Sequence, residues 1–351
     1  MWGVSRFRLA RRARAVVVAL LVVAALVAGC GDDDGPAVDP DAGLRADSGT
    51  MGGDVCAPAS GPVALAGQWA IRGELQVELL GRPDAFIHLC PDPQMATASF
   101  VMKATITGSG TSLGESLQLC DIGLPLSSGG VASCPMDPAD NLRVSVTVGS
   151  RLRDFLPTVG LFGTATLSGA VGGASFTAEP FAFVAGAMLA SPMTDPLPSW
   201  DTSITGCQTF DPMPTPTACV TALATTRDDD TDMQLGVTLD AVSNDAAMVL
   251  HGAGYAVLRL APALAGTVRN ANCVEGTLDG TLEYSLVDSD VILSGVAVET
   301  PALINNLPVI DVRPTSTFRM LRADGSGAND FDDDSDGTVT CVEISRHGLS
   351  P

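Results

Sequence analysis

Apolar and polar residues alternate with a period of two along much of this sequence, and this pattern is its strongest structural constraint. In the stretch 68–79, one side carries the apolar residues Trp69, Ile71, Leu75, Val77 and Leu79. The same alternation recurs in the stretches 100–107, 142–148 and 277–286. Because successive side chains of a β-strand point to opposite faces, the alternation predicts strands with one buried face.

Gly, Pro, Asn and Asp separate these stretches, and no segment after residue 60 sustains an apolar period of 3.6 residues. The sequence therefore predicts an all-β fold class, an antiparallel sandwich or barrel. We expect a turn at Asp288-Ser289-Asp290 that leads into a strand over 291–298 and forms a hairpin.

A proline-rich segment divides the body of the chain. Six prolines lie between residues 191 and 217, and proline at that density excludes central strands. We predict an N-terminal β unit over 61–190, a disulfide-stapled connection over 191–222 and a C-terminal β unit over 223–323. Whether the two units share one sheet stays open at this point.

The first 29 residues carry an export signal. Five arginines precede an uncharged apolar run over 15–28, which is too short to span a bilayer as a helix and is typical of a signal peptide. The sequence Val27-Ala28-Gly29-Cys30 resembles the lipobox of bacterial lipoproteins. That resemblance implies cleavage after Gly29 and a lipid on Cys30. Gly31, rather than Asp, follows the cysteine, which by the enterobacterial sorting rule favours anchoring in the cell outer membrane, facing the periplasm or the surface. An ordinary secretory signal is the alternative.

Residues 30–60 are acidic, small and turn-prone, and we expect a lipidated, extended tether there. Of the 19 basic residues, 14 remain after residue 29, against 40 acidic residues. A charge this negative argues against nucleic acid as a partner and is compatible with divalent cations. The sequence identifies no protein partner.

Eight cysteines follow Cys30, and an even number in an exported chain predicts a disulfide framework. They are Cys56, Cys90, Cys120, Cys134, Cys207, Cys219, Cys273 and Cys341. We expect Cys120–Cys134 and Cys207–Cys219 as pairs that close short loops. Zinc is the alternative, but the chain has no Cys-x-x-Cys and three histidines.

An acidic tail over 324–351 contains twelve residues, 332–343, that resemble the calcium-binding loop of EF-hand proteins. The resemblance implies oxygen ligands from Asp332, Asp334, Asp336, Thr338, Thr340 and Glu343, with Gly337 at the sharp turn and Val339 pointing inward. The preceding residues will not form an entering helix, whereas 341–347 can form an exit helix. We therefore expect an isolated, weak calcium loop, with a dissociation constant of the order of 10⁻⁴ to 10⁻³ M. A solvated acidic tail is the alternative.

Asp228, Asp230 and Asp232 repeat the first half of that spacing, with Met233 in place of the glycine. We interpret them as a surface turn and keep a second cation site as the alternative.

The sequence contains no convincing catalytic motif, and we expect no enzyme. Residues 110–114 fit the Gly-x-Ser-x-Gly motif of α/β-hydrolases, which requires a strand-to-helix turn. Residues 115–120 are predicted to be another strand, so we expect a hairpin turn. A hydrolase acting through Ser112 remains a minor alternative, and His251 is expected to be a structural residue of a strand.

Gly67-Gln68-Trp69 resembles the Gly-x-Trp start of lipocalins and lipocalin-like bacterial lipoproteins, which implies that Trp69 packs across a barrel floor. The layout also resembles a group of exported lipoproteins of high-GC Gram-negative bacteria. The residues that carry this resemblance are the lipobox, Asp228-x-Asp230-x-Asp232 before residues 236–239, and residues 316–319. That resemblance implies no particular activity. We hypothesise an anchored β protein, stabilised by calcium, that binds an apolar small molecule. A structural or adhesive surface lipoprotein without a ligand cavity is the alternative.

Overall fold

Eight strands in the described part of the chain form a closed ring. They are β1 (Gly67–Leu80), β2 (Gln94–Thr107), β3 (Ser112–Gly123), β6 (Gly160–Leu167), β7 (Ser175–Ala178), β10 (Leu250–Asn270), β11 (Cys273–Leu293) and β14 (Thr317–Arg322). Each pairs antiparallel with the next in this order, and β14 pairs with β1. The all-β prediction is confirmed, and the ring is an up-and-down barrel.

This computed structural model describes residues 55–83, 85, 88–126, 131–132, 143–208, 216–243, 249–324 and 330–347. All of them belong to the compact unit Gly53–Pro351. The predicted signal peptide, Cys30 and the tether up to residue 54 lie outside the described residues. No helix of the described part is long and apolar enough to cross a membrane.

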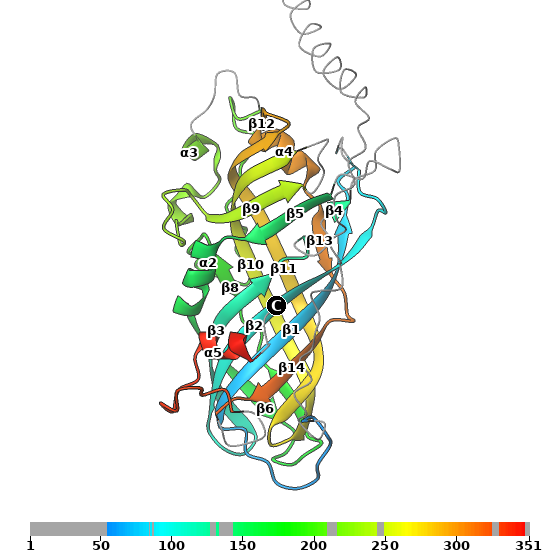
Figure 1. Cartoon of the computed structure of the whole chain (residues 1–351), viewed down its shortest axis with the longest axis vertical. Helices are drawn as coiled ribbons and strands as arrows, with labels where there is room; N and C mark the ends of the chain where they lie inside the picture. Colours follow the sequence, from blue (N-terminus) through cyan, green and yellow to red (C-terminus); the bar gives the residue numbers. More distant parts are fainter. Residues whose placement is uncertain are drawn as a thin grey trace, which may run out of the picture. The chain divides into compact units, whose positions relative to one another are not determined.

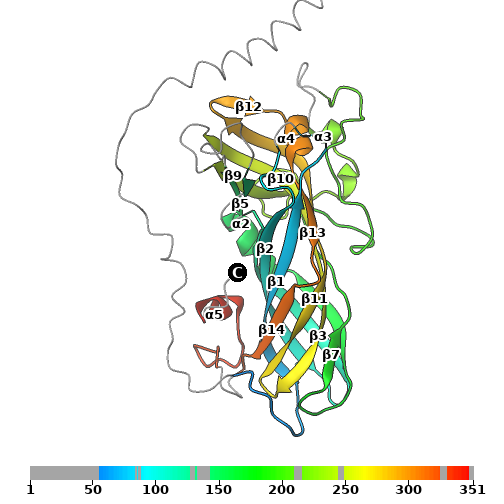
Figure 2. The ribbon, with the colours of Figure 1, turned by 90° about the vertical axis from the view of Figure 1, so that its right-hand side faces the viewer.

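Further strands extend the sheet at one end of the ring. They are β4 (Val131–Ala132), β5 (Arg143–Val148), β8 (Phe183–Ala185), β9 (Val237–Ser243), β12 (Val296–Val298) and β13 (Val309–Val312). Along its length β10 pairs first with β9, then with β8 and then with β7. Figures 1 and 2 show β10 and β11 running from the end with β6 and β7 to the end with β9 and β12.

The helical elements are short. They are α2 (Ser150–Phe155), η2 (Leu156–Thr158), α3 (Pro216–Cys219), η3 (Leu223–Thr225), α4 (Thr300–Asn306) and α5 (Cys341–Arg346). Figure 2 shows α5 beside the outer face of the barrel.

The two predicted β units share this one sheet, since β1 pairs with β14 and β7 with β10. The proline-rich connection between them lies on the outer wall. The Arg259 side chain, on β10, donates to the carbonyl of Asp195 at 2.7 Å, and the Trp200 N–H donates to the carbonyl of Leu286 at 2.7 Å. The described parts of the segment, 191–208 and 216–222, contribute no strand to the sheet, so their prolines interrupt no central strand.

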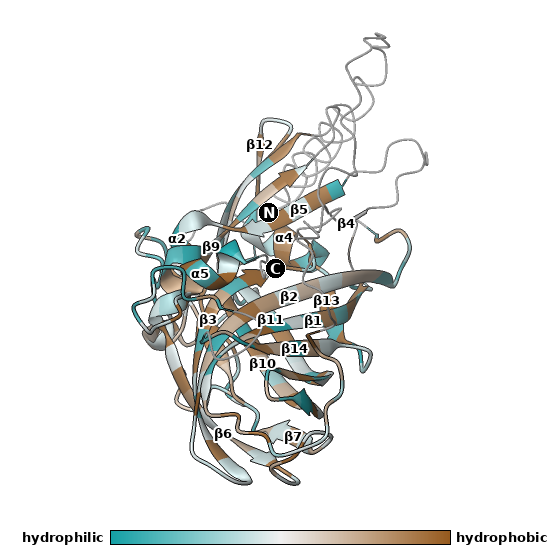
Figure 3. Cartoon of the chain, turned by 60° about the horizontal axis from the view of Figure 1, so that its bottom comes forward, coloured by the Kyte–Doolittle hydropathy of each residue, from teal (hydrophilic) through white to brown (hydrophobic). Residues whose placement is uncertain are grey.

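The predicted alternation corresponds to the two faces of the barrel wall, and Figure 3 shows it as bands of contrasting hydropathy along the strands. The apolar residues predicted for β1 are all buried in the main core. On the next strand Phe100 is fully buried. A Cβ on Gly73 would lie 2.3 Å from the Phe100 ring, so the missing side chain makes room for the aromatic ring.

The predicted turn at Asp288-Ser289-Asp290 is wrong, because β11 runs through it. Asp290 pairs with Ala253 of β10, and the chain turns instead at Ser294 and Gly295, which have φ values of 50° and 81°. Pairing with a continuous neighbouring strand outweighs the local turn preference of these polar residues.

The chain preceding β1 closes one end of the barrel. The Asn270 side-chain amide donates to the carbonyls of Val55 and Ala57 at 2.8 and 2.9 Å. The guanidinium of Arg322 lies 4.8 Å from the ring centroid of Trp69, which is fully buried and donates to the Leu65 carbonyl at 2.7 Å. Trp69 therefore packs at the closed end of the ring.

Three disulfides join described residues: Cys56–Cys273, Cys120–Cys341 and Cys207–Cys219. Cys90 is also disulfide-bonded, and Cys134 lies outside the described residues. The predicted Cys207–Cys219 pair is confirmed. The predicted Cys120–Cys134 pair is wrong, because the C-terminal segment packs on the outer face of β3 and brings Cys341 to Cys120. Sequence proximity did not capture this tertiary contact.

Glu115 is an ionisable residue at a position that faces the interior of the barrel. It is 5 % exposed, shares the side of β3 with Leu113 and Leu117, and has no hydrogen bond or ion pair to another described residue. Burial raises the pKa of Glu115 from 4.5 to about 7, because the charged carboxylate loses solvation.

We therefore predict that Glu115→Gln changes the pH dependence of stability. Below pH 4.5 Glu115 is protonated in both the folded and the unfolded chain, so its burial does not lower the free energy of unfolding. Between pH 4.5 and pH 7 the unfolded chain releases this proton more readily, and the fold loses up to about 3 kcal/mol of stability. Relative to wild type, the variant should gain free energy of unfolding across this range. Chemical denaturation at several pH values measures it. Glu179→Gln, at an exposed carboxylate, is the control. Parallel curves for wild type and Glu115→Gln would contradict the assignment.

Candidate functional site

The C-terminal segment forms a tight loop that gathers three carboxylates. One carboxylate oxygen each of Asp332, Asp334 and Glu343 lies within 4.8 Å of the others. Hard divalent cations such as calcium bind oxygen ligands of this kind, so these three residues are the ones that can hold a cation here.

Backbone hydrogen bonds to Asp332 define the shape of the loop. Its two carboxylate oxygens accept from the N–H groups of Asp336 at 3.1 Å and Gly337 at 2.8 Å. Ser335 and Gly337 adopt the left-handed conformation, with φ values of 59° and 85°. The glycine thus occupies a position that disfavours other residues, as the sequence pattern predicts.

Glu343 closes the loop from the first turn of α5. The side chain of Thr340 accepts from the Glu343 N–H, and the Glu343 carboxylate accepts from the Thr340 N–H at 2.7 Å, which forms a capping box. The Thr340 hydroxyl and backbone N–H lower the pKa of Glu343. Glu343 is 4 % exposed, and these hydrogen bonds hold its carboxylate in place.

The other predicted ligands are engaged differently. The Asp336 carboxylate accepts from the Thr338 N–H at 2.7 Å, and the Thr340 hydroxyl donates to Glu343 at 2.7 Å. The structure therefore brings together three of the predicted ligands and does not group Asp336 with them. The predicted exit helix is present as α5, and Val339 is buried as expected, at 1 % exposure.

The loop is fixed to the outer wall of the barrel. The Gln68 side-chain amide donates to the Gly337 carbonyl at 2.9 Å, and its oxygen accepts from the Val339 N–H at 2.9 Å. Val339 packs in a small outer cluster with Ala70 and Val101, and Cys341 is bonded to Cys120. The tail is therefore held against β1, β2 and β3.

An apolar cavity of about 90 Å³ lies at the opposite end of the sheet from the closed end. Its lining comes from β5, β9, β10, β11, β13, α4 and the segment 124–126, and includes Leu126, Val146, Leu239, Ala241, Leu282 and Leu303. Tyr284 also lines it, and its hydroxyl donates to the Pro308 carbonyl at 2.5 Å. A surface of this kind can bind an apolar molecule without charge recognition.

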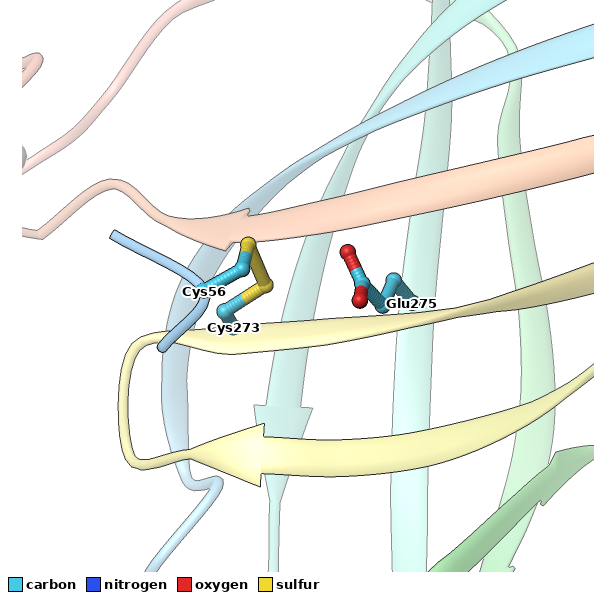
Figure 4. A group of neighbouring side chains, drawn as sticks. All are labelled: Cys56, Cys273 and Glu275. Carbon is cyan, nitrogen blue, oxygen red and sulfur yellow. A yellow bond between two sulfur atoms is a disulfide. The ribbon is translucent and has the colours of Figure 1, made fainter. Parts of the chain in front are cut away.

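Two other side-chain groups have structural explanations. Figure 4 shows Glu275 beside the Cys56–Cys273 disulfide; the sulfurs are bonded to each other, and Glu275 pairs with Arg269 at 3.1 Å. Ser112 begins β3 after a hairpin turn, as predicted, whereas His251 lies in β10. Strands β6 and β7 separate β3 from β10 in the sheet, so the fold does not bring these two residues together.

No protein-family model, curated protein or solved structure matches this chain. The sequence pattern found the C-terminal loop, because its carboxylates follow one another along the chain. It missed the apolar cavity, whose wall comes from seven separate segments. Its residues have the same alternation as the rest of the core, so they carry no distinguishing signal in the sequence.

Proposed function

We propose that this protein is an exported lipoprotein, anchored through Cys30, whose β body binds an apolar small molecule at the end opposite the closed one. The observation that carries the proposal is the cavity lined by Leu239, Ala241, Leu282 and their apolar neighbours. The three disulfides support export, because such bonds persist in oxidising compartments.

The size of the cavity limits the ligand. An apolar cavity of about 150 Å³ binds benzene, and the space here is about 90 Å³. It suits a very small apolar molecule, or the end of a longer chain whose remainder lies outside, and it is too small for a whole lipid.

A structural or adhesive surface lipoprotein is the second candidate. The interior of the eight-stranded ring favours it, because large side chains such as Trp69, Phe100 and Phe176 fill that interior. An eight-stranded barrel has room for either side chains or one small ligand. The two candidates differ in whether the end cavity is used.

We predict that Ala241→Leu abolishes binding of an apolar ligand, because its three added carbon atoms occupy the cavity. Ligand-observed NMR with benzene, hexanoate and decanoate measures binding, and native mass spectrometry reveals a ligand that co-purifies. Val242→Leu, on the exposed outer side of β9, is the control and should bind like wild type. Wild-type protein that binds none of these probes and carries no adduct would favour the structural candidate.

We also propose that the loop 332–343 binds calcium weakly and stabilises the C-terminal segment. Calcium at about ten times the dissociation constant should raise the melting temperature by a few degrees. Asp334→Asn should reduce this shift, because it removes one of the three grouped carboxylates. Asp333→Asn is the control, since that carboxylate turns away to His347 at 2.9 Å. An equal shift in both variants would contradict the assignment.

The anchor is tested by Cys30→Ser. We expect the wild type in the membrane fraction, labelled by palmitate, and the variant in the released fraction without label, because a lipid chain supplies the membrane affinity. Thermal melts of the two proteins should coincide. A variant that stays in the membrane fraction would show that another feature holds the protein there.

A further inference from the structure

A second group of carboxylates lies in the segment between η3 and β9. One carboxylate oxygen each of Asp228, Asp230 and Asp232 lies within 4.8 Å of the others. Asp230 is only 3 % exposed, and its Oδ1 atom has no hydrogen-bond partner among the described residues. Its Oδ2 atom accepts from the Thr238 N–H at 2.8 Å. A buried carboxylate oxygen without a partner is costly, so this atom requires a ligand or a proton.

Further carboxylates lie near the group, and the neighbouring cation Arg151 forms no ion pair with it. None of the three carboxylates forms an ion pair with another described residue. Burial raises the pKa of the nearby Tyr255, and the carboxylates of Asp290, Asp232 and Asp288 raise it further. The Arg151 guanidinium reaches the loop but donates to the Thr231 carbonyl at 2.7 Å, which leaves the carboxylates available.

The backbone around this group has the same conformation as the C-terminal loop. Asp228 accepts from the N–H groups four and five residues later, at 3.0 and 2.9 Å, as Asp332 does at 3.1 and 2.8 Å. Thr231 and Met233 have φ values of 56° and 74°, where Ser335 and Gly337 have 59° and 85°.

The two loops are also attached to the barrel in the same way. Leu235 packs against an apolar cluster on the outer wall, and it holds the same place in its loop as the buried Val339 does in the other. The loops differ at the far end, where Leu239 stands in place of Glu343. The first of these loops, 228–239, therefore lacks a closing glutamate and has the buried Asp230 in its interior.

We propose that Asp228, Asp230 and Asp232 bind a divalent cation of the calcium type. An all-carboxylate oxygen site selects calcium or magnesium over metals that prefer nitrogen and sulfur. The ion supplies the missing partner of Asp230 and neutralises three neighbouring negative charges. Water completes its coordination on the side of Asp228 that solvent reaches. The proposed site does not depend on cation binding by the loop 332–343, because the buried oxygen atom without a partner belongs to Asp230.

The test counts bound calcium per chain in the intact protein with disulfides formed. The protein is stripped with a chelator, dialysed against calcium and measured by elemental analysis. Wild type should bind two ions, Asp230→Asn one and Asp334→Asn one, and the double variant none. Asp240→Asn, an exposed carboxylate on β9, is the matched control and should bind two. Circular dichroism verifies folding, and Asp228→Asn, at a position less buried than Asp230, replaces Asp230→Asn if that variant unfolds.

The outcomes separate the two loops. Loss of one ion in Asp230→Asn or Asp228→Asn supports the proposal, whatever Asp334→Asn does. An unchanged count in both Asp230→Asn and Asp228→Asn overturns it. Loss of one ion in these variants, with an unchanged count in Asp334→Asn, would support this site and would show that the loop 332–343 binds no calcium.

Discussion

The β10–β11 hairpin determines how the rest of the sheet is arranged. Its strands pair from Leu250 with Leu293 to Asn270 with Cys273, and 21 residues in each span roughly 70 Å at about 3.3 Å per residue. The ring neighbours β7 and β14 pair with only a few residues at one end of it. The remaining edges would expose unpaired backbone groups and apolar side chains. Strands β8 and β9 pair with this edge of β10, and β12 pairs with the end of β11. The apolar cavity forms where β5, β9 and α4 enclose the inner face of the extension.

The closed end depends on one buried cation. Arg322 is 7 % exposed, stacks on Trp69 and donates to the carbonyls of Ala64, Ala66 and Ala271, with Asp324 as its ion-pair partner. A buried guanidinium is tolerated only when its donors are satisfied, so this side chain specifies how three separate segments meet. The Cys56–Cys273 bond links two of them across 217 residues of sequence. At this end polar bonding specifies the structure, whereas the opposite end encloses a cavity lined mainly by apolar side chains.

Local sequence patterns predicted the features that depend on interactions between residues close together in the sequence. The period of two identified β1 because one face of that strand is buried along its whole length, and the acidic spacing identified the loop 332–343 because its hydrogen bonds join near neighbours. The errors concern long-range contacts. Asp288–Asp290 has turn-forming residues, yet pairing with β10 keeps it extended. Cys120 has a close neighbour in sequence, yet the packing of the tail gives it Cys341. Burial of Asp230 likewise follows from the position of its loop on the barrel, which the spacing of aspartates does not encode.

The proposed cation site and the proposed ligand cavity meet at one strand. Asp230 and Asp232 both accept hydrogen bonds from Thr238, on the outer side of β9. The next residue, Leu239, and then Ala241 point to the other side and line the cavity. An ion bound by Asp230 would therefore fix the outer face of the strand whose inner face forms the ligand wall. The C-terminal loop contacts β1, β2 and β3, which contribute no strand residue to that wall. Of the two loops, only the first is placed to couple cation binding to the apolar cavity, since coupling requires a contiguous element that both sites contact.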